Sequence, residues 1–110
     1  MTTYWHGGSY PSGGVLTPQP VMRSGANSDG WVYITTERDL AATYAATLPN
    51  SWLMEVEPIG AVEPDPGSIL HTSWRCRSAR VVRRYSLSGR ERATRSRFVR
   101  EAHARFGGLM

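Results

Sequence analysis

The chain has 110 residues, 40% of them apolar, and a formal net charge of +4 from 13 arginines and nine acidic residues. This length predicts one domain over residues 1–110, and the seven prolines and eleven glycines favour short strands and turns over a helical bundle. A single cysteine excludes an internal disulfide, and no apolar run reaches membrane-spanning length, so we expect a cytoplasmic protein with no membrane partner.

The first half of the chain alternates between β-prone segments and turns rich in glycine and proline. Residues 3–6 predict a short aromatic strand, and residues 15–30 are expected to be irregular. Residues 31–35 predict a second strand. Apolar residues at helical spacing then predict one amphipathic helix over about 37–48, with the Thr36 hydroxyl as its N-cap.

The second half predicts further strands and a second helix. Residues 51–57 alternate between apolar and polar side chains, which indicates a half-buried strand, and residues 58–72 are rich in turn formers. Residues 74–85 predict one or two strands, and residues 90–106 predict a basic helix. The sum is an α+β fold: a small split or curled β-sheet with one central helix and a basic C-terminal helix.

Charge is divided unevenly along the chain. Residues 1–79 hold four arginines and seven acidic residues, whereas residues 80–110 hold nine arginines and two glutamates. Such a basic end predicts attraction to an anionic partner, either a nucleic acid or an acidic protein. The alternative is a solvated arginine face whose Phe98 and Phe106 pack on the body of the domain.

Three polar residues each stand at the end of a short apolar run, where they could line one cleft: His6, Tyr33 and Asp65. A metal site is not expected, because the histidines and Cys76 lack the spacing of zinc ligands. The sequence has neither a serine in a nucleophile-elbow context nor a phosphate-binding loop with its lysine.

Cleavage of the nicotinamide–ribose bond of NAD suits these residue types better. Nicotinamide is a good leaving group, so the protein has only to hold the dinucleotide and set a carboxylate beside the cation that develops on the ribose. Tyr33 can stack on the nicotinamide, His6 can hold a ribose hydroxyl, the Gly7 backbone can bond the carboxamide, and Asp65 can stabilise the cation. Glu63 is a rival carboxylate two residues away.

Two arginines are further candidates in this hypothesis. Arg23 can pair with the NAD pyrophosphate, although a solvated loop arginine is the alternative. Arg77 can orient Asp65 or Glu63 through a bidentate pair, although a cation on a strand face is the simpler interpretation.

Six segments together resemble the rifamycin-inactivating ADP-ribosyltransferases, which belong to the wider diphtheria-toxin and poly-ADP-ribose-polymerase fold. The resemblance implies that His6, Tyr33 and Asp65 are the catalytic and NAD-binding trio, and that the product is a rifamycin-type antibiotic ADP-ribosylated on a hydroxyl. The segments lie within about residues 4–82: Tyr4-Trp5-His6-Gly7-Gly8, Leu16-Thr17-Pro18, Val32-Tyr33-Ile34-Thr35, Ala41-Ala42, Val56-Glu57-Pro58-Ile59-Gly60-Ala61-Val62-Glu63-Pro64-Asp65-Pro66 and Ser73-Trp74-Arg75-Cys76-Arg77.

The chain departs from that family in two places, which leaves other functions open. The segment from Asp65 to Ser73 is several residues shorter than in the drug-modifying enzymes, and the C-terminal end is an arginine-rich helix. Both departures suit a protein or nucleic-acid acceptor, as in a toxin or phage effector. The remaining alternatives are an NAD-dependent RNA 2′-phosphotransferase, a domain that binds NAD without turnover, and a non-catalytic basic nucleic-acid-binding module.

Overall fold

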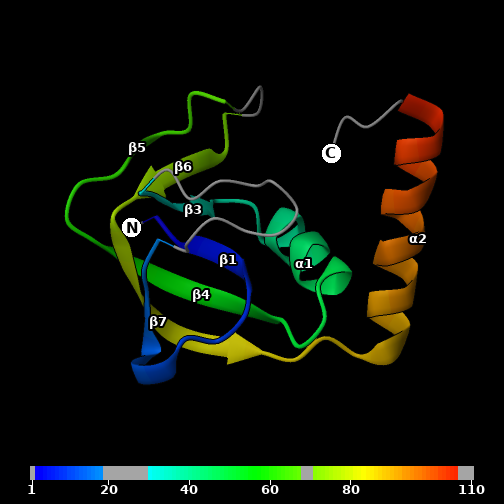
Figure 1. The fold of residues 1–110 in the computed structure, drawn as a ribbon, viewed down its shortest axis with the longest axis horizontal. Coiled ribbons are helices and arrows are strands. Elements are labelled where there is room, and N and C mark those ends of the chain that lie inside the picture. Colours follow the sequence, from blue (N-terminus) through cyan, green and yellow to red (C-terminus); the bar gives the residue numbers. More distant parts are fainter. Residues whose placement is uncertain (1, 19–29, 68–70, 107–110) are drawn as a thin grey trace.

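A computed structural model describes residues 2–18, 30–67 and 71–106 of the chain. It contains two α-helices, a short 3₁₀ turn and seven strands (Figure 1). In chain order these are β1 (Tyr4–Gly8), η1 (Ser12–Gly14), β2 (Val15–Leu16), β3 (Val32–Thr35), α1 (Arg38–Thr47), β4 (Trp52–Ile59), β5 (Glu63–Pro64), β6 (Ser73–Cys76), β7 (Ser78–Tyr85) and α2 (Gly89–Phe106).

The seven strands form one antiparallel sheet in the order β2-β7-β4-β1-β3-β6-β5. This arrangement confirms the expected mixed α+β class. Strand β1 pairs with β4 along its whole length, from Tyr4 to Gly8. Its pairing with β3 is limited to Trp5 and Thr35. Of the two pairings made by the central strand β1, the one with β3 is therefore the shorter.

Apolar side chains pack on both faces of the sheet, because alternate residues of a strand point to opposite sides. In β4, Met54 joins the cluster on one face and Leu53 joins the cluster under α1 on the other. Cys76 is fully buried in the first cluster, and this burial raises the pKa of its thiol above the ordinary value of 9.0. Its sulfur lies 3.8 Å from the Val32 carbonyl oxygen.

Helix α1 lies directly against β1, because small residues form both surfaces. Its buried residues are all alanines, which lets its backbone approach the sheet closely. A Cβ atom on Gly7 would lie 2.1 Å from the Ala41 carbonyl oxygen and 2.8 Å from the Ala45 nitrogen. Glycine is thus required at position 7 by the packing of the helix on the strand.

The ends of several elements differ from the sequence-based expectation. Thr36 does not cap α1; the Glu37 amide instead donates to the Thr35 hydroxyl over 3.0 Å, and the helix begins at Arg38. Strands β2 and β5 fall in segments for which irregular structure or turns were expected. Each has only two residues, so its pairing with a longer neighbour, β7 or β6, defines it rather than any periodic pattern.

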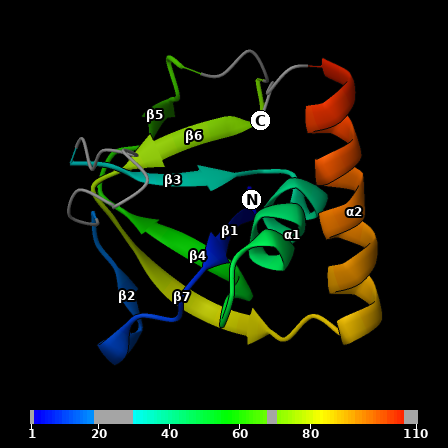
Figure 2. The ribbon, with the colours of Figure 1, turned by 45° about the vertical axis from the view of Figure 1, so that its right-hand side comes forward.

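Helix α2 occupies the region where the basic helix was expected, and α1 lies between it and the sheet (Figures 1 and 2). Arg92 caps the C-terminal end of α1: it donates to the carbonyl oxygens of Ala45, at 2.9 Å, and Leu48, at 3.4 Å, and also to that of Ser51. A cation at this end of a helix satisfies carbonyl groups that have no partner within the helix.

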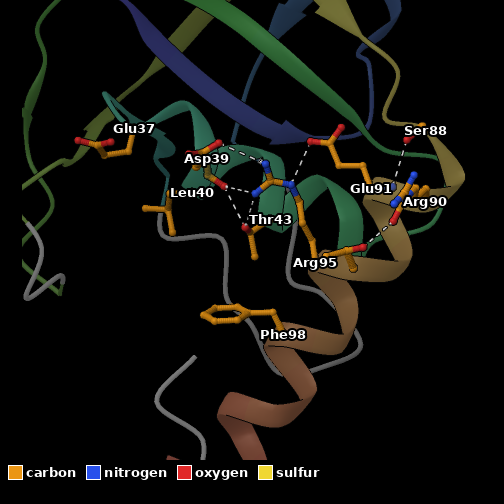
Figure 3. A pocket seen from close by; sticks show the side chains of 10 residues that line it. Glu37, Asp39, Leu40, Thr43, Ser88, Arg90, Glu91, Arg95 and Phe98 are labelled. Atoms are coloured by element: carbon orange, nitrogen blue, oxygen red, sulfur yellow. Dashed lines mark hydrogen bonds and ion pairs between the residues drawn. The ribbon is translucent and has the colours of Figure 1, made fainter.

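Arg95 forms the second attachment of α2 to α1. It donates to the Asp39 carboxylate and to the Thr43 hydroxyl, each over 3.2 Å, and also pairs with Glu91 one turn earlier in α2 (Figure 3). Phe98, expected to pack on the body of the domain, is instead 66% exposed, so that expectation is wrong for this residue. The side chain of Phe106 lies outside the described residues.

Replacing Arg92 by alanine is expected to lower the free energy of unfolding by about 2 kcal/mol, since bonds from a charged donor to partly buried carbonyl groups are lost. Urea denaturation followed by circular dichroism measures this loss. Arg97→Ala, at an exposed position of the same helix, is the control and should change stability by less than about 0.5 kcal/mol. Equal stability of the two variants would contradict a capping role for Arg92.

Among the described residues, neither helix is long and apolar enough to cross a membrane.

Candidate functional site

His6 connects the central strand to β3 across the junction that has a single residue pair. Its Nδ1 lies 2.7 Å from the Tyr33 carbonyl oxygen. Because a carbonyl oxygen can only accept, Nδ1 carries the proton of this hydrogen bond. Burial lowers the pKa of His6 below 6.5, against the opposing effect of the bond to Tyr33, so the imidazole is neutral at pH 7. Its Nε2 then offers a lone pair, which suits a hydroxyl donor.

The lowered pKa of His6 predicts that acid destabilises the fold. As the pH falls below 6.5, His6 binds a proton in the unfolded chain before it does so in the folded chain. The contribution of His6 to stability is therefore complete above pH 6.5 and declines as the pH falls toward the lowered pKa of the folded state. Measuring the free energy of unfolding from pH 7 to about pH 5 should show a decline that is smaller in His6→Asn. The control His71→Asn, at an exposed position, should keep the wild-type decline.

Tyr33 lies on β3 between two buried residues, yet the residue is 37% exposed. It stands directly opposite Arg75 on β6, and Arg75 stands opposite Glu63 on β5. Directly opposed residues of antiparallel strands project from the same face, so these three side chains form one row across the sheet. Tyr33 is thus partly accessible to solvent on this face.

Arg75 is the central member of this row. Its Nε donates to Glu63 Oε1 over 2.6 Å, and its Nη2 pairs with the same oxygen. Its guanidinium carbon lies 4.1 Å from the centre of the Trp31 ring. The bond to Glu63 raises the pKa of Arg75, and a hydrogen bond with the Tyr33 phenol adds to this effect. Arg75 thus links Glu63, Trp31 and Tyr33.

Asp65 extends the β5–β6 pairing beyond Pro64, since its amide donates to the Ser73 carbonyl oxygen over 3.1 Å. The carboxylate is held at both oxygens: Oδ1 accepts from the Gly67 amide at 2.9 Å, and Oδ2 accepts from the Ser73 hydroxyl at 3.0 Å. Each carboxylate oxygen has a further lone pair, so the group remains able to interact with a ligand.

Asp65 and Tyr33 lie on the same face of the sheet. Asp65 is paired with Ser73, and Ser73 lies opposite Thr35, two residues along β3 from Tyr33. Asp65 and Tyr33 are therefore two strand spacings apart, about 10 Å across the sheet. Strand alternation places His6 on the other face, since it is paired with the buried Met54. His6 meets Tyr33 at the backbone, and the convergence of all three side chains on one ligand stays a prediction.

The remaining candidate residues have different outcomes. Arg23 lies outside the described residues. Arg77 does not orient Asp65 or Glu63: its Nη1 donates to the Gly30 carbonyl oxygen over 2.7 Å, and its guanidinium stacks on Trp31 at 3.7 Å. The partner of Glu63 is Arg75, which was not among the residues expected at the site. The available signal was the spacing of the two positions, because alternate residues of the strand expected over 74–85 would share one face.

A separate groove of about 830 Å³ lies between the start of α1 and the first half of α2 (Figure 3). Phe98 and Leu40 form its apolar part, and the charged side chains at its rim belong to both helices. None of His6, Tyr33 and Asp65 lines it. Within the described ranges, no three or more His, Cys, Asp or Glu side chains are grouped as ligands of a metal ion.

Comparison of the chain with protein-family models and with curated protein sequences finds no significant match to either. The likeness to the rifamycin-modifying enzymes therefore depends on the six segments quoted above. What the structure adds is the set of contacts made by residues of those segments. Four of these residues are called the candidate site: Tyr33, Asp65 and Arg75 share one sheet face, and His6 meets the Tyr33 backbone from the other.

Proposed function

We propose that this chain is an NAD-dependent mono-ADP-ribosyltransferase with the diphtheria-toxin and poly-ADP-ribose-polymerase type of fold. The observation that carries the proposal is the fixed carboxylate of Asp65 on the same sheet face as the exposed Tyr33 ring. The supporting contact is the bond between His6 and the Tyr33 carbonyl, which joins residues 27 positions apart in the sequence. Tyr33 and Asp65 supply a stacking ring and an oriented negative charge on one face, and the proposal requires the hydroxyl acceptor of His6 to reach the same ligand across the junction of β1 and β3.

In the proposed reaction the bond between nicotinamide and ribose C1′ breaks, and its electron pair leaves with neutral nicotinamide. An acceptor hydroxyl forms a new bond to C1′ and loses its proton to water. Asp65 stabilises the positive charge that develops on the ribose between these two events. Tyr33 stacks on the nicotinamide, the neutral His6 accepts from a ribose hydroxyl through Nε2, and the Gly7 backbone bonds the carboxamide. Arg23 is the proposed partner of the pyrophosphate.

The proposed acceptor is a hydroxyl of a rifamycin-type antibiotic, by resemblance. A specific observation favours a second candidate, a macromolecular acceptor that is anionic. Arg92 and Arg95 are engaged with α1, whereas Arg90, Arg97 and Arg100 are exposed along α2. These three cations provide an attachment surface for nucleic acid or an acidic protein.

The test is incubation of the purified chain with NAD, with and without rifampicin, while released nicotinamide and the mass of the drug are measured. Rifampicin-dependent release and a drug that gains one ADP-ribose unit support the proposal. Release with transfer to added nucleic acid or protein, and not to the drug, selects the macromolecular acceptor. Absence of release under all conditions contradicts the transferase function. Salt-sensitive nucleic-acid binding in that case indicates the non-catalytic basic module.

A further inference from the structure

We propose that Arg75 is a positioning residue that holds the Tyr33 ring at the candidate site, and that Glu63 and Trp31 serve to hold Arg75. Glu63 is then a structural partner of a cation rather than the carboxylate that meets the acceptor. This inference rests on the proposed function, in which Tyr33 stacks on nicotinamide. It adds Arg75 to the site and gives Glu63 and Asp65 different roles, the first structural and the second electrostatic.

The register of three strands brings Arg75 next to Tyr33. Glu63, Arg75 and Tyr33 are directly opposed on β5, β6 and β3, so Arg75 stands between its carboxylate partner and the tyrosine. Two nitrogens of the guanidinium bind one oxygen of Glu63, which fixes the plane of the group. Direct opposition also sets the guanidinium beside Tyr33, whose phenol contributes to the raised pKa of Arg75. We infer that this neighbouring cation restrains the Tyr33 ring beyond its attachment to the backbone.

An aromatic ring lies beneath the Arg75 guanidinium. Trp31 precedes Tyr33 by two residues, and Arg75 stacks on it at 4.1 Å. Arg77 stacks on the same ring at 3.7 Å, so the indole lies against two cations. Stacking on an aromatic face restrains a guanidinium in the direction that in-plane hydrogen bonds leave free. Arg75 is therefore held in its plane by Glu63 and perpendicular to it by Trp31.

Arg75 is more buried than the arginine of a comparable ion pair in the same sheet. Arg80 and Glu57 form another arginine–glutamate pair between directly opposed residues, on β7 and β4. In that pair the arginine side chain is 59% exposed, against 20% for Arg75. Exposed ion pairs contribute little and are mobile, whereas a more buried and multiply bonded arginine is ordered. The Arg80 pair is thus a matched control for the Arg75 pair.

Glu63 and Asp65 differ in the same way. The Arg75 cation binds Glu63 directly, which neutralises the field of that carboxylate at a ligand. The partners of Asp65 are an amide and a hydroxyl, which orient the group without cancelling its charge. Asp65 therefore remains the carboxylate that can stabilise a developing cation.

The test uses Arg75→Gln, Arg75→Lys, Glu63→Gln and the control Arg80→Gln, each assayed for nicotinamide release over a range of NAD concentrations. Stacking by Tyr33 acts on bound NAD before and during reaction, so its loss raises KM by about tenfold and changes kcat by less than about threefold. Arg75→Gln and Glu63→Gln should show this pattern, Arg75→Lys should fall between Arg75→Gln and wild type, and Arg80→Gln should match wild type.

An unfolding experiment provides a readout that does not involve NAD. The free energies of unfolding of Tyr33→Phe, Arg75→Gln and the double variant form a cycle, as do those of Tyr33→Phe with Arg80→Gln. The Arg75 cycle should be non-additive and the Arg80 cycle additive. Additivity in both cycles overturns the inference, even where the wild-type chain transfers ADP-ribose.

The kinetic outcomes separate the two proposals. A wild-type KM for Arg75→Gln, or a fall in kcat without a rise in KM for Glu63→Gln, overturns the assignment of Arg75 and Glu63 while the transferase function stands. Absence of nicotinamide release from the wild-type chain overturns the transferase function, and with it any role of Arg75 in holding NAD. A non-additive Arg75 cycle in that case leaves only the structural link between Arg75 and Tyr33.

Discussion

Asp65→Asn is expected to lower the rate of nicotinamide release on the order of 10²–10³-fold, the scale for loss of one preorganised electrostatic partner. Asparagine has the shape of aspartate, so its oxygen can still accept from the Gly67 amide and its amide group can still meet the Ser73 hydroxyl. The substitution therefore removes the charge and keeps the turn. Steady-state kinetics with saturating NAD measures the effect as a fall in kcat.

Ser73→Ala is the matched control for this substitution. It removes the bond to Asp65 Oδ2 and leaves the charge in place, so kcat should fall much less than in Asp65→Asn. Equal losses in the two variants would show that orientation of the turn, rather than charge, matters to the reaction. An unchanged rate in Asp65→Asn would remove this carboxylate from the mechanism.

Gly7→Ala is expected to lower the free energy of unfolding by about 3 kcal/mol, the upper part of the usual range for overpacking. The new methyl group would meet backbone atoms of Ala41 and Ala45 at 2.1 and 2.8 Å, and backbone cannot rotate away as a flexible side chain can. Helix α1 must therefore move off β1. Urea denaturation measures the loss, and nicotinamide release should fall with it because the Gly7 backbone is displaced.

Gly89→Ala is the control, since a Cβ atom at that position has no neighbour within 4 Å. It should leave stability within about 0.5 kcal/mol of wild type. Similar stabilities of Gly7→Ala and Gly89→Ala would contradict the close contact between α1 and the central strand.

Sequence patterns predicted the elements that have internal periodicity. The helix expected over 37–48 is α1, Arg38–Thr47, and the alternating segment 51–57 lies almost wholly within β4, Trp52–Ile59. Two-residue strands have no period, so β2 and β5 depend on neighbours brought to them by the rest of the fold. The cap expected at Thr36 was wrong because the helix begins one residue later, after Glu37, and has no side-chain capping bond.

The contacts of the candidate site depend on strand order and register, which a single sequence does not reveal. His6 reaches the Tyr33 carbonyl because β1 and β3 are neighbours, although they are separate in the chain. The partner of Glu63 could be Arg75 or Arg77 by alternation, since both project from the same face. Only the register of β5 against β6 selects Arg75. Residue type and local pattern were sufficient to propose an NAD site, but not to assign this pair.

Because the Cys76 thiol is buried and protonated, the chain can be labelled selectively at an introduced cysteine. Alkylating reagents attack the thiolate, and a buried thiol with a raised pKa presents little of it. A cysteine introduced at the exposed position 98 would therefore take up a maleimide dye far faster than the native one. A donor dye at that place could report, by energy transfer to a fluorescent dinucleotide analogue, how far the outer helix lies from the bound ligand.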